Sequence, residues 1–245
     1  MITGSTDGIG KGFAEVLAEE GFNIIIVGRS PEKLEKTQKE MEQKYKERKF
    51  ETRCLDLNTP DVQKYIELGE SVADLDVAIL VNNAGVGDIS PLAEAEYTEL
   101  EKLININMAH SVYLTRNLVP RMLKREKHSA VLFTTAFCAD YPHPGLATYA
   151  ATKRFNDHFA KCLAYENPSK IDFLSFKPSL VKTGMNTFKV SFSVLSPRQA
   201  VNGILDKLGY EISSEGSWHH VVSTSPLKGM VSLLPSRFVY GLIFE

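Results

Sequence analysis

Short β-branched and aromatic runs alternate along this chain with amphipathic stretches of helical length, from residue 1 to about residue 177. Two neighbouring parallel strands need a crossover of a dozen or more residues, and a helix of this length supplies it. The runs are apolar almost throughout, as strands covered on both faces are. The alternation therefore predicts an α/β fold in three layers, α/β/α, with a doubly wound parallel sheet whose strands include residues 22–27, 50–55, 77–81, 130–134 and 171–176.

The helices between these strands carry recognisable start and stop signals. Ser30-Pro31 is typical of an N-cap followed by proline at the first helical position, and Gly21 ends an earlier helical stretch. We interpret the Lys/Glu-rich residues 32–49 as the solvated face of a helix rather than as a binding surface. No internal repeat or linker interrupts the pattern, so we expect a single domain over residues 1–245.

The composition indicates which kinds of molecule this protein can be expected to bind. The formal net charge is -2 and no Lys/Arg patch is interleaved with aromatic residues, so we expect no nucleic-acid partner and favour a small molecule. Cys54, Cys138 and Cys162 lack metal-ligand spacing and cannot all pair, so we expect no metal site and a reducing compartment. No apolar run approaches the roughly 20 residues that span a bilayer.

Residues 3–10 place three glycines, in the spacing G-x-x-x-G-x-G, where the first strand turns into a helix. Glycine lets a backbone approach a diphosphate closely, and a helix N-terminus presents N–H groups to it. A tight turn alone gives the same pattern, so the context must decide between the two. The dinucleotide site that we expect here comprises Gly4, Ser5, Asp7, Gly8, Ile9 and Gly10.

The residue after the second strand indicates which nicotinamide cofactor to expect. An acidic residue there binds the ribose hydroxyls of NAD, whereas an arginine accepts the 2′-phosphate of NADP. The strand is followed by Gly28-Arg29-Ser30, so a cation stands at this position and we predict NADP(H). Asp56, just past the third strand, is a candidate hydrogen-bond partner for the adenine, with a helix cap or turn as the alternative.

Three further motifs resemble those of one protein family. Asn82-Asn83-Ala84-Gly85 follows the fourth strand, Asn105-Ile-Asn107 comes later, and Tyr149-Ala-Ala-Thr-Lys153 follows the fifth strand. With the glycine loop, they make essentially the whole chain similar to the short-chain dehydrogenase/reductase family. Two further details narrow the resemblance to the 17β-hydroxysteroid dehydrogenase and very-long-chain 3-oxoacyl-CoA reductase branch of the family. They are the loop sequence Gly-Ser-Thr-Asp-Gly-Ile-Gly-Lys and the sequence Leu-Pro-Ser at 234–236.

The resemblance implies a Rossmann-type fold and assigns roles to residues of this chain. Residues 1–177 become the cofactor-binding core, and 178–245 a substrate flap and C-terminal appendage. The catalytic residues that it implies are Asn107, Tyr149 and Lys153. The cofactor contacts that it implies, beyond those already named, are Asn83, Ala84, Gly85, Tyr149, Lys153, Pro178, Val181 and Thr183.

Tyr149 and Lys153 suit the reduction of a carbonyl group. Hydride transfer builds negative charge on the substrate oxygen, so a positioned acid must supply a proton. Lys153 lies one helical turn after Tyr149, shares its face and favours the phenolate electrostatically. Many helices carry a Tyr–Lys pair at this spacing by chance, so the role depends on the other motifs.

One position departs from the family pattern. The family places a serine thirteen positions before the tyrosine, where its hydroxyl bonds the substrate carbonyl, and this chain has Ala136 there. Losing one donor to a developing oxyanion costs on the order of 10²–10³ in rate. Thr135 should point to the opposite face of the strand, whereas Thr134 shares the face but lies two residues away.

Two functions therefore stay open at this point. The first is NADPH-dependent reduction of a ketone on a hydrophobic substrate, a 3-oxoacyl-CoA or a steroid-like molecule. The second is a catalytically impaired pseudoenzyme or scaffold that still binds the cofactor. A third possible function is that of a peripheral membrane protein that uses the fold only as a platform. Such a protein would not bind NADPH.

Apolar residues after position 184 form the expected substrate side. Met185, Phe188, Phe192, Val194 and Leu195 predict a flap that favours a hydrophobic substrate, with core packing as the alternative. Residues 227–244 suggest contact with a membrane surface or a subunit interface, and core packing is an equal alternative. The histidines at 143, 219 and 220 lack partners at ligand spacing, so no role is assigned to them.

The resemblance also carries expectations about location and assembly. Relatives of this branch are commonly anchored in the endoplasmic reticulum, so we expect its membrane or cytosolic face, or the cytoplasm if the chain is complete as given. Only three residues precede the glycine loop, and we expect a missing upstream segment with the rest of the first strand. A homodimer is expected by resemblance only.

Overall fold

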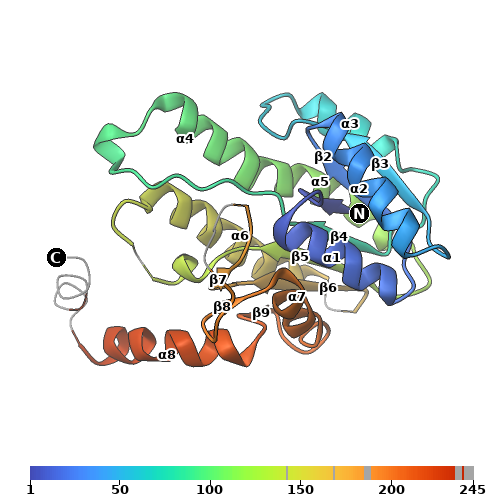
Figure 1. Ribbon diagram of the computed structural model, residues 1–245. Helices are drawn as coiled ribbons and strands as arrows, with labels where there is room; N and C mark the ends of the chain where they lie inside the picture. The colour runs from blue at the N-terminus through green and yellow to red at the C-terminus, as the bar shows by residue number, and fades with distance from the viewer. Residues whose placement is uncertain (142, 168, 185–188, 235–238, 240–245) are drawn as a thin grey trace.

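Parallel strands form the central sheet of this computed structural model, which describes residues 1–141, 143–167, 169–184, 189–234 and 239. The strand order is β3-β2-β1-β4-β5-β6-β9 (Figure 1). The order reverses beside β1, and ligands of doubly wound sheets bind outside the carboxyl ends of the strands at such a reversal. The strands are β1 Ile2–Thr3, β2 Ile24–Gly28, β3 Phe50–Cys54, β4 Ile79–Asn82, β5 Ser129–Thr134, β6 Ile171–Phe176 and β9 Ser213–Ser214.

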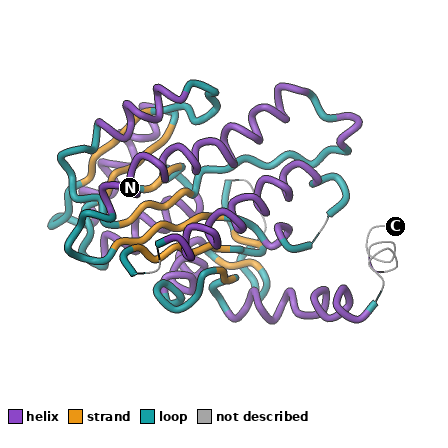
Figure 2. The backbone as a smooth tube through the Cα atoms, turned by 180° about the vertical axis from the view of Figure 1, so that it is seen from behind, coloured by secondary structure: helices purple, strands orange, loops and turns teal. Residues whose placement is uncertain are grey.

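Helices cover both faces of this sheet, so the predicted three-layer α/β fold is confirmed (Figures 1 and 2). Ile24 and Ile26 of β2 pack in the core beneath α1, α2 and α7. Ile25 and Val27, which alternate with them, pack in the opposite core beneath α3, α5 and α6. The helices are α1 Gly8–Glu19, α2 Pro31–Lys44, α3 Val62–Glu70, α4 Tyr97–Ile104, α5 His110–Met122, α6 Ala147–Glu166, α7 Pro197–Leu205 and α8 Trp218–Leu233.

The boundaries of β6 match the prediction, and those of the other predicted strands differ from it by one or two residues. Ser30 caps α2 with Pro31 at its first position, also as predicted. The helix nevertheless ends at Lys44, five residues before the end of the Lys/Glu-rich stretch. The intervening residues turn the chain back, which places Phe50 beside Ile24 at the start of the β2–β3 pairing.

After β6 the chain forms a second, two-stranded sheet of β7 (Leu180–Val181) and β8 (Val194–Leu195). Val194 and Leu195 are 6% and 1% exposed, so they pack as core, the alternative that the sequence left open, and not as a flap. Phe192 is 54% exposed, and its ring contacts Trp218 and His219. Met185 and Phe188 of the expected flap lie outside the described residues.

The apolar tail begins within α8, which projects beyond the end of the sheet in both views (Figures 1 and 2). Of the tail residues after this helix, Val239 is buried, whereas Phe238, Tyr240, Leu242 and Ile243 lie outside the described part of the chain. In the residues that the structure describes, no helix combines the length and apolar character that a membrane crossing requires.

Candidate functional site

The turn between β1 and α1 depends on glycine. Gly4 and Gly8 have φ angles of 64° and 55°, in the left-handed region that glycine adopts without strain. A Cβ atom at Gly10 would lie 2.3 Å from the carbonyl oxygen of Gly4. The first turn of α1 therefore packs directly against the loop, as a diphosphate-binding turn requires.

Ser5 and Asp7 stabilise this loop from two sides. The buried Ser5 hydroxyl donates to the carbonyl of Ile2 at 2.8 Å and accepts from the N–H of Val27 at 3.1 Å. Asp7 caps α1, because its Oδ1 accepts from the N–H of Gly8 at 2.7 Å. Ser5 thus braces the loop from behind, whereas Asp7 borders the cavity in front of it.

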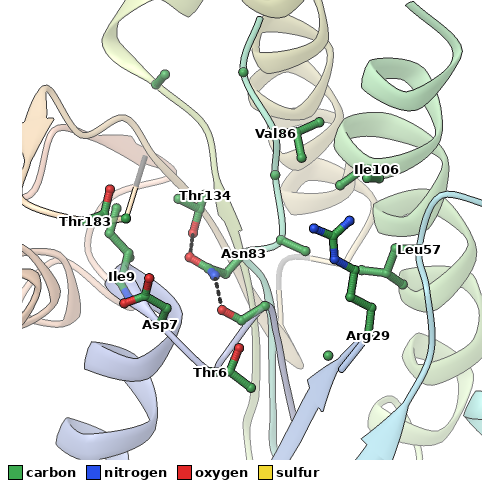
Figure 3. Close-up of a pocket in the computed structure, with 18 of the residues that line it drawn as sticks. Thr6, Asp7, Ile9, Arg29, Leu57, Asn83, Val86, Ile106, Thr134 and Thr183 are labelled. Carbon is green, nitrogen blue, oxygen red and sulfur yellow. Dashed lines mark hydrogen bonds between the residues drawn. The ribbon is translucent and has the colours of Figure 1, made fainter. Parts of the chain in front are cut away.

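A cavity of about 720 Å³ opens at the carboxyl ends of the central strands (Figure 3). Small-molecule and cofactor sites are commonly about 300–1,000 Å³. Among the residues predicted from the sequence, Ser5, Gly10 and Asn107 lie behind its walls. The others border it: Gly4, Asp7, Gly8, Ile9, Arg29, Asp56, Asn83, Ala84, Gly85, Tyr149, Lys153, Pro178, Val181 and Thr183.

Two cationic side chains border one end of the cavity. Arg29 extends into it from the end of β2 (Figure 3), and Lys33 borders it from the first turn of α2. The Ser30 hydroxyl accepts from the Lys33 N–H at 3.3 Å, which sets this turn against the cavity. The sequence analysis named only Arg29, although the N-cap at Ser30 already indicated where Lys33 would lie. Asp56 borders the same end, and its Oδ1 accepts from the Asn58 N–H at 3.0 Å in the turn that was its alternative role.

The Asn-Asn-Ala-Gly motif is fastened to the glycine loop by one hydroxyl. Thr3 Oγ1 accepts from the N–H groups of Asn83 and Ala84, each at 3.0 Å. The Asn83 amide donates back to the carbonyl of Thr3 at 3.0 Å. It also accepts from the Thr134 hydroxyl at 3.2 Å and donates to the carbonyl of Gly4 at 3.4 Å (Figure 3). The motif therefore ties β1, β4 and β5 together at the floor of the cavity.

Tyr149 and Lys153 meet where α6 passes this floor. Lys153 Nζ donates to the carbonyl of Thr134 at 3.0 Å and lies 5.6 Å from the centre of the Tyr149 ring. Burial lowers the pKa of Lys153 from 10.5 to about 8, and burial raises the pKa of Tyr149 well above 10. A Cβ atom at Gly85 would lie 2.9 Å from Lys153 Nζ, so glycine leaves the space that the ammonium group occupies.

Asn107 is fully buried in a π-helical turn, Asn105–Ala109, which interrupts the helix between α4 and α5. Its amide accepts from the N–H of Val86 and donates to the Val86 carbonyl, both at 2.9 Å, and it also donates to Thr152 at 3.0 Å. The carbonyl of Asn107 accepts from Asn156 at 2.6 Å. Asn107 therefore connects the cavity wall at Val86 to helix α6 without itself facing the cavity.

Ala136 borders the cavity where the resembled family has its serine. Thr135 borders the cavity as well, and its buried hydroxyl donates to the carbonyl of Phe176 at 2.7 Å. Thr134 also borders the cavity, and its hydroxyl is bonded to Asn83. Both threonines thus border the cavity, and their hydroxyls bond to different partners, Asn83 for Thr134 and Phe176 for Thr135.

Two buried residues beside the site, His110 and Cys138, were not predicted from the sequence as site residues. The His110 ring contacts the Thr3 hydroxyl at 3.4 Å and the carbonyl of Ile106, and burial lowers its pKa to about 4. Cys138 interacts electrostatically with Tyr149, and burial raises the pKa of its thiol. Neither residue belongs to a motif with a recognisable spacing, so no pattern pointed to them.

A model of the short chain dehydrogenase family matches residues 1–192. The very-long-chain 3-oxoacyl-CoA reductase-B of Danio rerio is 33% identical over 247 residues, which cover 98% of this chain and 76% of that protein. The chain belongs to the short-chain dehydrogenase family. The human protein called inactive hydroxysteroid dehydrogenase-like protein 1 is 34% identical over 231 residues, 91% of this chain and 69% of that one. These relatives confirm the branch predicted from the motifs, which contains 17β-hydroxysteroid dehydrogenases and very-long-chain 3-oxoacyl-CoA reductases.

Solved structures of short-chain dehydrogenases have the same fold. The structure of a 7β-hydroxysteroid dehydrogenase superposes with a TM-score of 0.86 at 19% identity and covers 100% of this chain and 95% of its own. A Sphingobium yanoikuyae short-chain dehydrogenase in complex with NADPH superposes with a TM-score of 0.79 at 22% identity and covers 96% of this chain and 95% of its own. At such identities the likeness establishes the fold alone.

Proposed function

We propose that this short-chain dehydrogenase is an NADPH-dependent reductase of a ketone on a hydrophobic substrate. The observation that carries the proposal is the meeting of Tyr149 and Lys153 at the floor of one cavity, with Arg29 and Lys33 bordering it as well. Solved relatives bind NADPH, and curated relatives carry the name 3-oxoacyl-CoA reductase. A long acyl or steroid-like ketone is therefore the substrate class to test first.

The residues that border the cavity fit a dinucleotide. The loop at Gly4 and Gly8 accepts a diphosphate at the start of α1, and a Cβ atom at either position would meet neighbouring residues at 3.0 Å. Arg29 and Lys33 supply cations for a 2′-phosphate, and no carboxylate follows β2 directly to bind ribose hydroxyls instead. Pro178, Val181 and Thr183 would hold the nicotinamide half from the opposite wall, with Lys153 at its ribose.

Tyr149 is suited to act as the proton donor. The bound nicotinamide supplies the hydride, and the substrate oxygen then needs a proton as charge develops on it. Because burial raises the pKa of Tyr149, its hydroxyl stays protonated at neutral pH until charge builds beside it. Lys153 is protonated below about pH 8 and stabilises the phenolate left after proton transfer.

The alternative is a pseudoenzyme that binds NADPH and does not turn over. Ala136 removes the hydroxyl that the family aims at the substrate carbonyl, and a relative of this chain is itself called inactive. Thr134 and Thr135 border the cavity beside Ala136, but the Thr134 hydroxyl already donates to Asn83 and the Thr135 hydroxyl to Phe176. Both functions include NADPH binding, so only turnover distinguishes them.

The deciding experiment is NADPH oxidation at 340 nm with a long-chain 3-oxoacyl-CoA and with a 17-ketosteroid. We expect slow turnover that Tyr149→Phe abolishes and Ala136→Ser raises by about 10²-fold. Thr134→Val tests whether the neighbouring hydroxyl replaces the serine. If NADPH binds but neither substrate is reduced, and Ala136→Ser creates activity, the natural protein is a degenerate reductase.

Peripheral contact with the endoplasmic reticulum membrane is a second proposal about the same protein. The exposed apolar side chains Trp218, Val221 and Val222 lie together on the first turns of α8. We expect the chain to float with phosphatidylcholine vesicles and the Trp218→Ser, Val222→Ser variant to remain in the soluble fraction. Equal recovery of both proteins in the soluble fraction would refute the proposal.

A further inference from the structure

His220 is a buried histidine without a role in the proposed chemistry. It lies in the first turn of α8, far along the chain from the catalytic pair, and is 0% exposed. Its Nδ1 accepts from the N–H of Ser179 at 3.4 Å, and its Nε2 contacts the carbonyl of Leu180 at 3.2 Å. The imidazole of His220 thus bonds the backbone N–H of Ser179 and the backbone carbonyl of the next residue, Leu180.

These two contacts determine the tautomer of the ring. An amide N–H is only a donor, so Nδ1 of His220 must be unprotonated where it meets Ser179. The proton is then on Nε2, which donates it to Leu180. The neutral ring matches its surroundings, because burial lowers the pKa of His220. The side chain therefore bonds the backbone of Ser179 and of Leu180, and a backbone hydrogen bond with Glu215 also acts on the ring.

The segment that His220 holds is a wall of the cavity. Pro178, Ser179, Val181 and Thr183 all border it. The Thr183 side chain packs against the glycine loop, since a Cβ atom at Gly8 would lie 3.0 Å from Thr183 Cγ2. A displacement of residues 179–180 would therefore move both ends of this wall.

The segment contains one short strand. Its strand, β7, is two residues long and pairs only with β8, outside the main sheet, and so short a ladder is marginal alone. The Phe137 N–H donates to the carbonyl of Pro178 at 2.9 Å, and the Lys182 N–H donates to the carbonyl of Leu195 at 2.9 Å. His220 supplies two of the hydrogen bonds that hold this wall.

The start of α8 is itself rigidly placed. A Cβ atom at Gly203 of α7 would lie 2.9 Å from the backbone nitrogen of Ser217, the N-cap of α8. Gly216 has a φ of 74° and packs equally closely on Ile204. The His220 side chain thus extends from the N-terminus of α8, which cannot shift without displacing α7.

We propose that His220 is a positioning residue for the nicotinamide half of the cofactor, because it fixes the backbone at Ser179 and Leu180 and with it the wall that carries Val181 and Thr183. The inference rests on the proposed cofactor site. It predicts that His220 affects the nicotinamide end of the cavity and leaves the end at Arg29 unchanged.

The test compares two ligands by fluorescence titration. NADPH occupies the whole site, whereas 2′-phospho-ADP-ribose lacks the nicotinamide. Removing both hydrogen bonds in His220→Leu should raise the Kd of NADPH about tenfold and change that of the fragment less than twofold. His220→Gln retains a donor near the Nε2 position and should recover most of the NADPH affinity. The control His219→Leu, at a neighbour that does not contact Ser179 or Leu180, should behave as the natural protein.

The outcomes separate the inference from the proposed function. If the natural protein binds neither ligand, the cofactor site is refuted and His220 loses this role with it. If the natural protein binds both, and His220→Leu weakens both equally or neither, the positioning role alone is refuted. If His220→Leu does not fold, the decision falls to the polar but shorter His220→Asn variant, which must raise the NADPH Kd more than that of the fragment.

Discussion

Replacing Lys153 by methionine should stabilise the nucleotide-free protein at neutral pH. Lys153 is 4% exposed, and burial lowers its pKa from 10.5 to about 8. Each pKa unit corresponds to about 1.4 kcal/mol, so carrying the charge costs the folded state roughly 3 kcal/mol below pH 8. Methionine also leaves the carbonyl of Thr134 without its donor, at a cost of about 1 kcal/mol. The net gain is about 2 kcal/mol.

The sign of this effect should reverse with pH. The folded pKa is lower than the unfolded one, so between pH 8 and 10.5 the unfolded chain binds more protons, and the natural protein gains stability as pH rises. Near pH 10.5 the cost of the charge has disappeared and only the lost hydrogen bond remains. There, Lys153→Met should be the less stable protein by about 1 kcal/mol.

Urea unfolding at pH 7 and at pH 10.5 measures both differences. The matched control is Lys161→Met on the same helix, because Lys161 pairs with the buried Asp157 at 2.6 Å. Its loss leaves that carboxylate less compensated, so this variant should be less stable at both pH values. If Lys153→Met were no more stable than the natural protein at pH 7, and the difference did not change with pH, the buried charge would carry no cost and the reasoning would fail.

Three further outcomes are expected. Arg29→Asp should weaken NADPH binding about 10- to 100-fold, as the loss of charge-assisted hydrogen bonds does, and leave NADH binding unchanged in parallel titrations. Gly10→Ala, whose Cβ would meet the Gly4 carbonyl oxygen at 2.3 Å, should lose about 3 kcal/mol in urea unfolding, whereas Gly229→Ala, with no neighbour within 4 Å, should gain up to about 1 kcal/mol. In a pH series, kcat/KM for NADPH should fall above about pH 8 as Lys153 loses its charge; a flat profile to pH 9.5 would contradict this role.

Motifs with a local physical cause were predictable from the sequence. The glycine loop, the N-cap at Ser30 and the alternation of Ile24 to Val27 each depend on neighbours in the chain, and the structure has them where expected. Arg29 was found because its position at the end of β2 follows from the strand itself.

Residues that act across the fold were not predictable in the same way. His110 and His220 each contact residues from segments distant in the sequence, and a lone histidine in an apolar stretch carries no spacing signal. Asn107 was named from a motif, but its place behind the cavity wall follows from a π-helical turn that no local propensity indicates. Val194 and Leu195 were apolar enough for a flap, and only the β7–β8 pairing shows that they are core.

The carboxylate of Asp7 has a consequence for anion binding at the glycine loop. It accepts from the N–H of Gly8 at the start of α1, where a helix presents its partial positive charge. The loop therefore carries its own anion at the place where a diphosphate would bind. A diphosphate bound here would be a second anion at the same helix N-terminus, so its affinity would be lowered by repulsion from the Asp7 carboxylate.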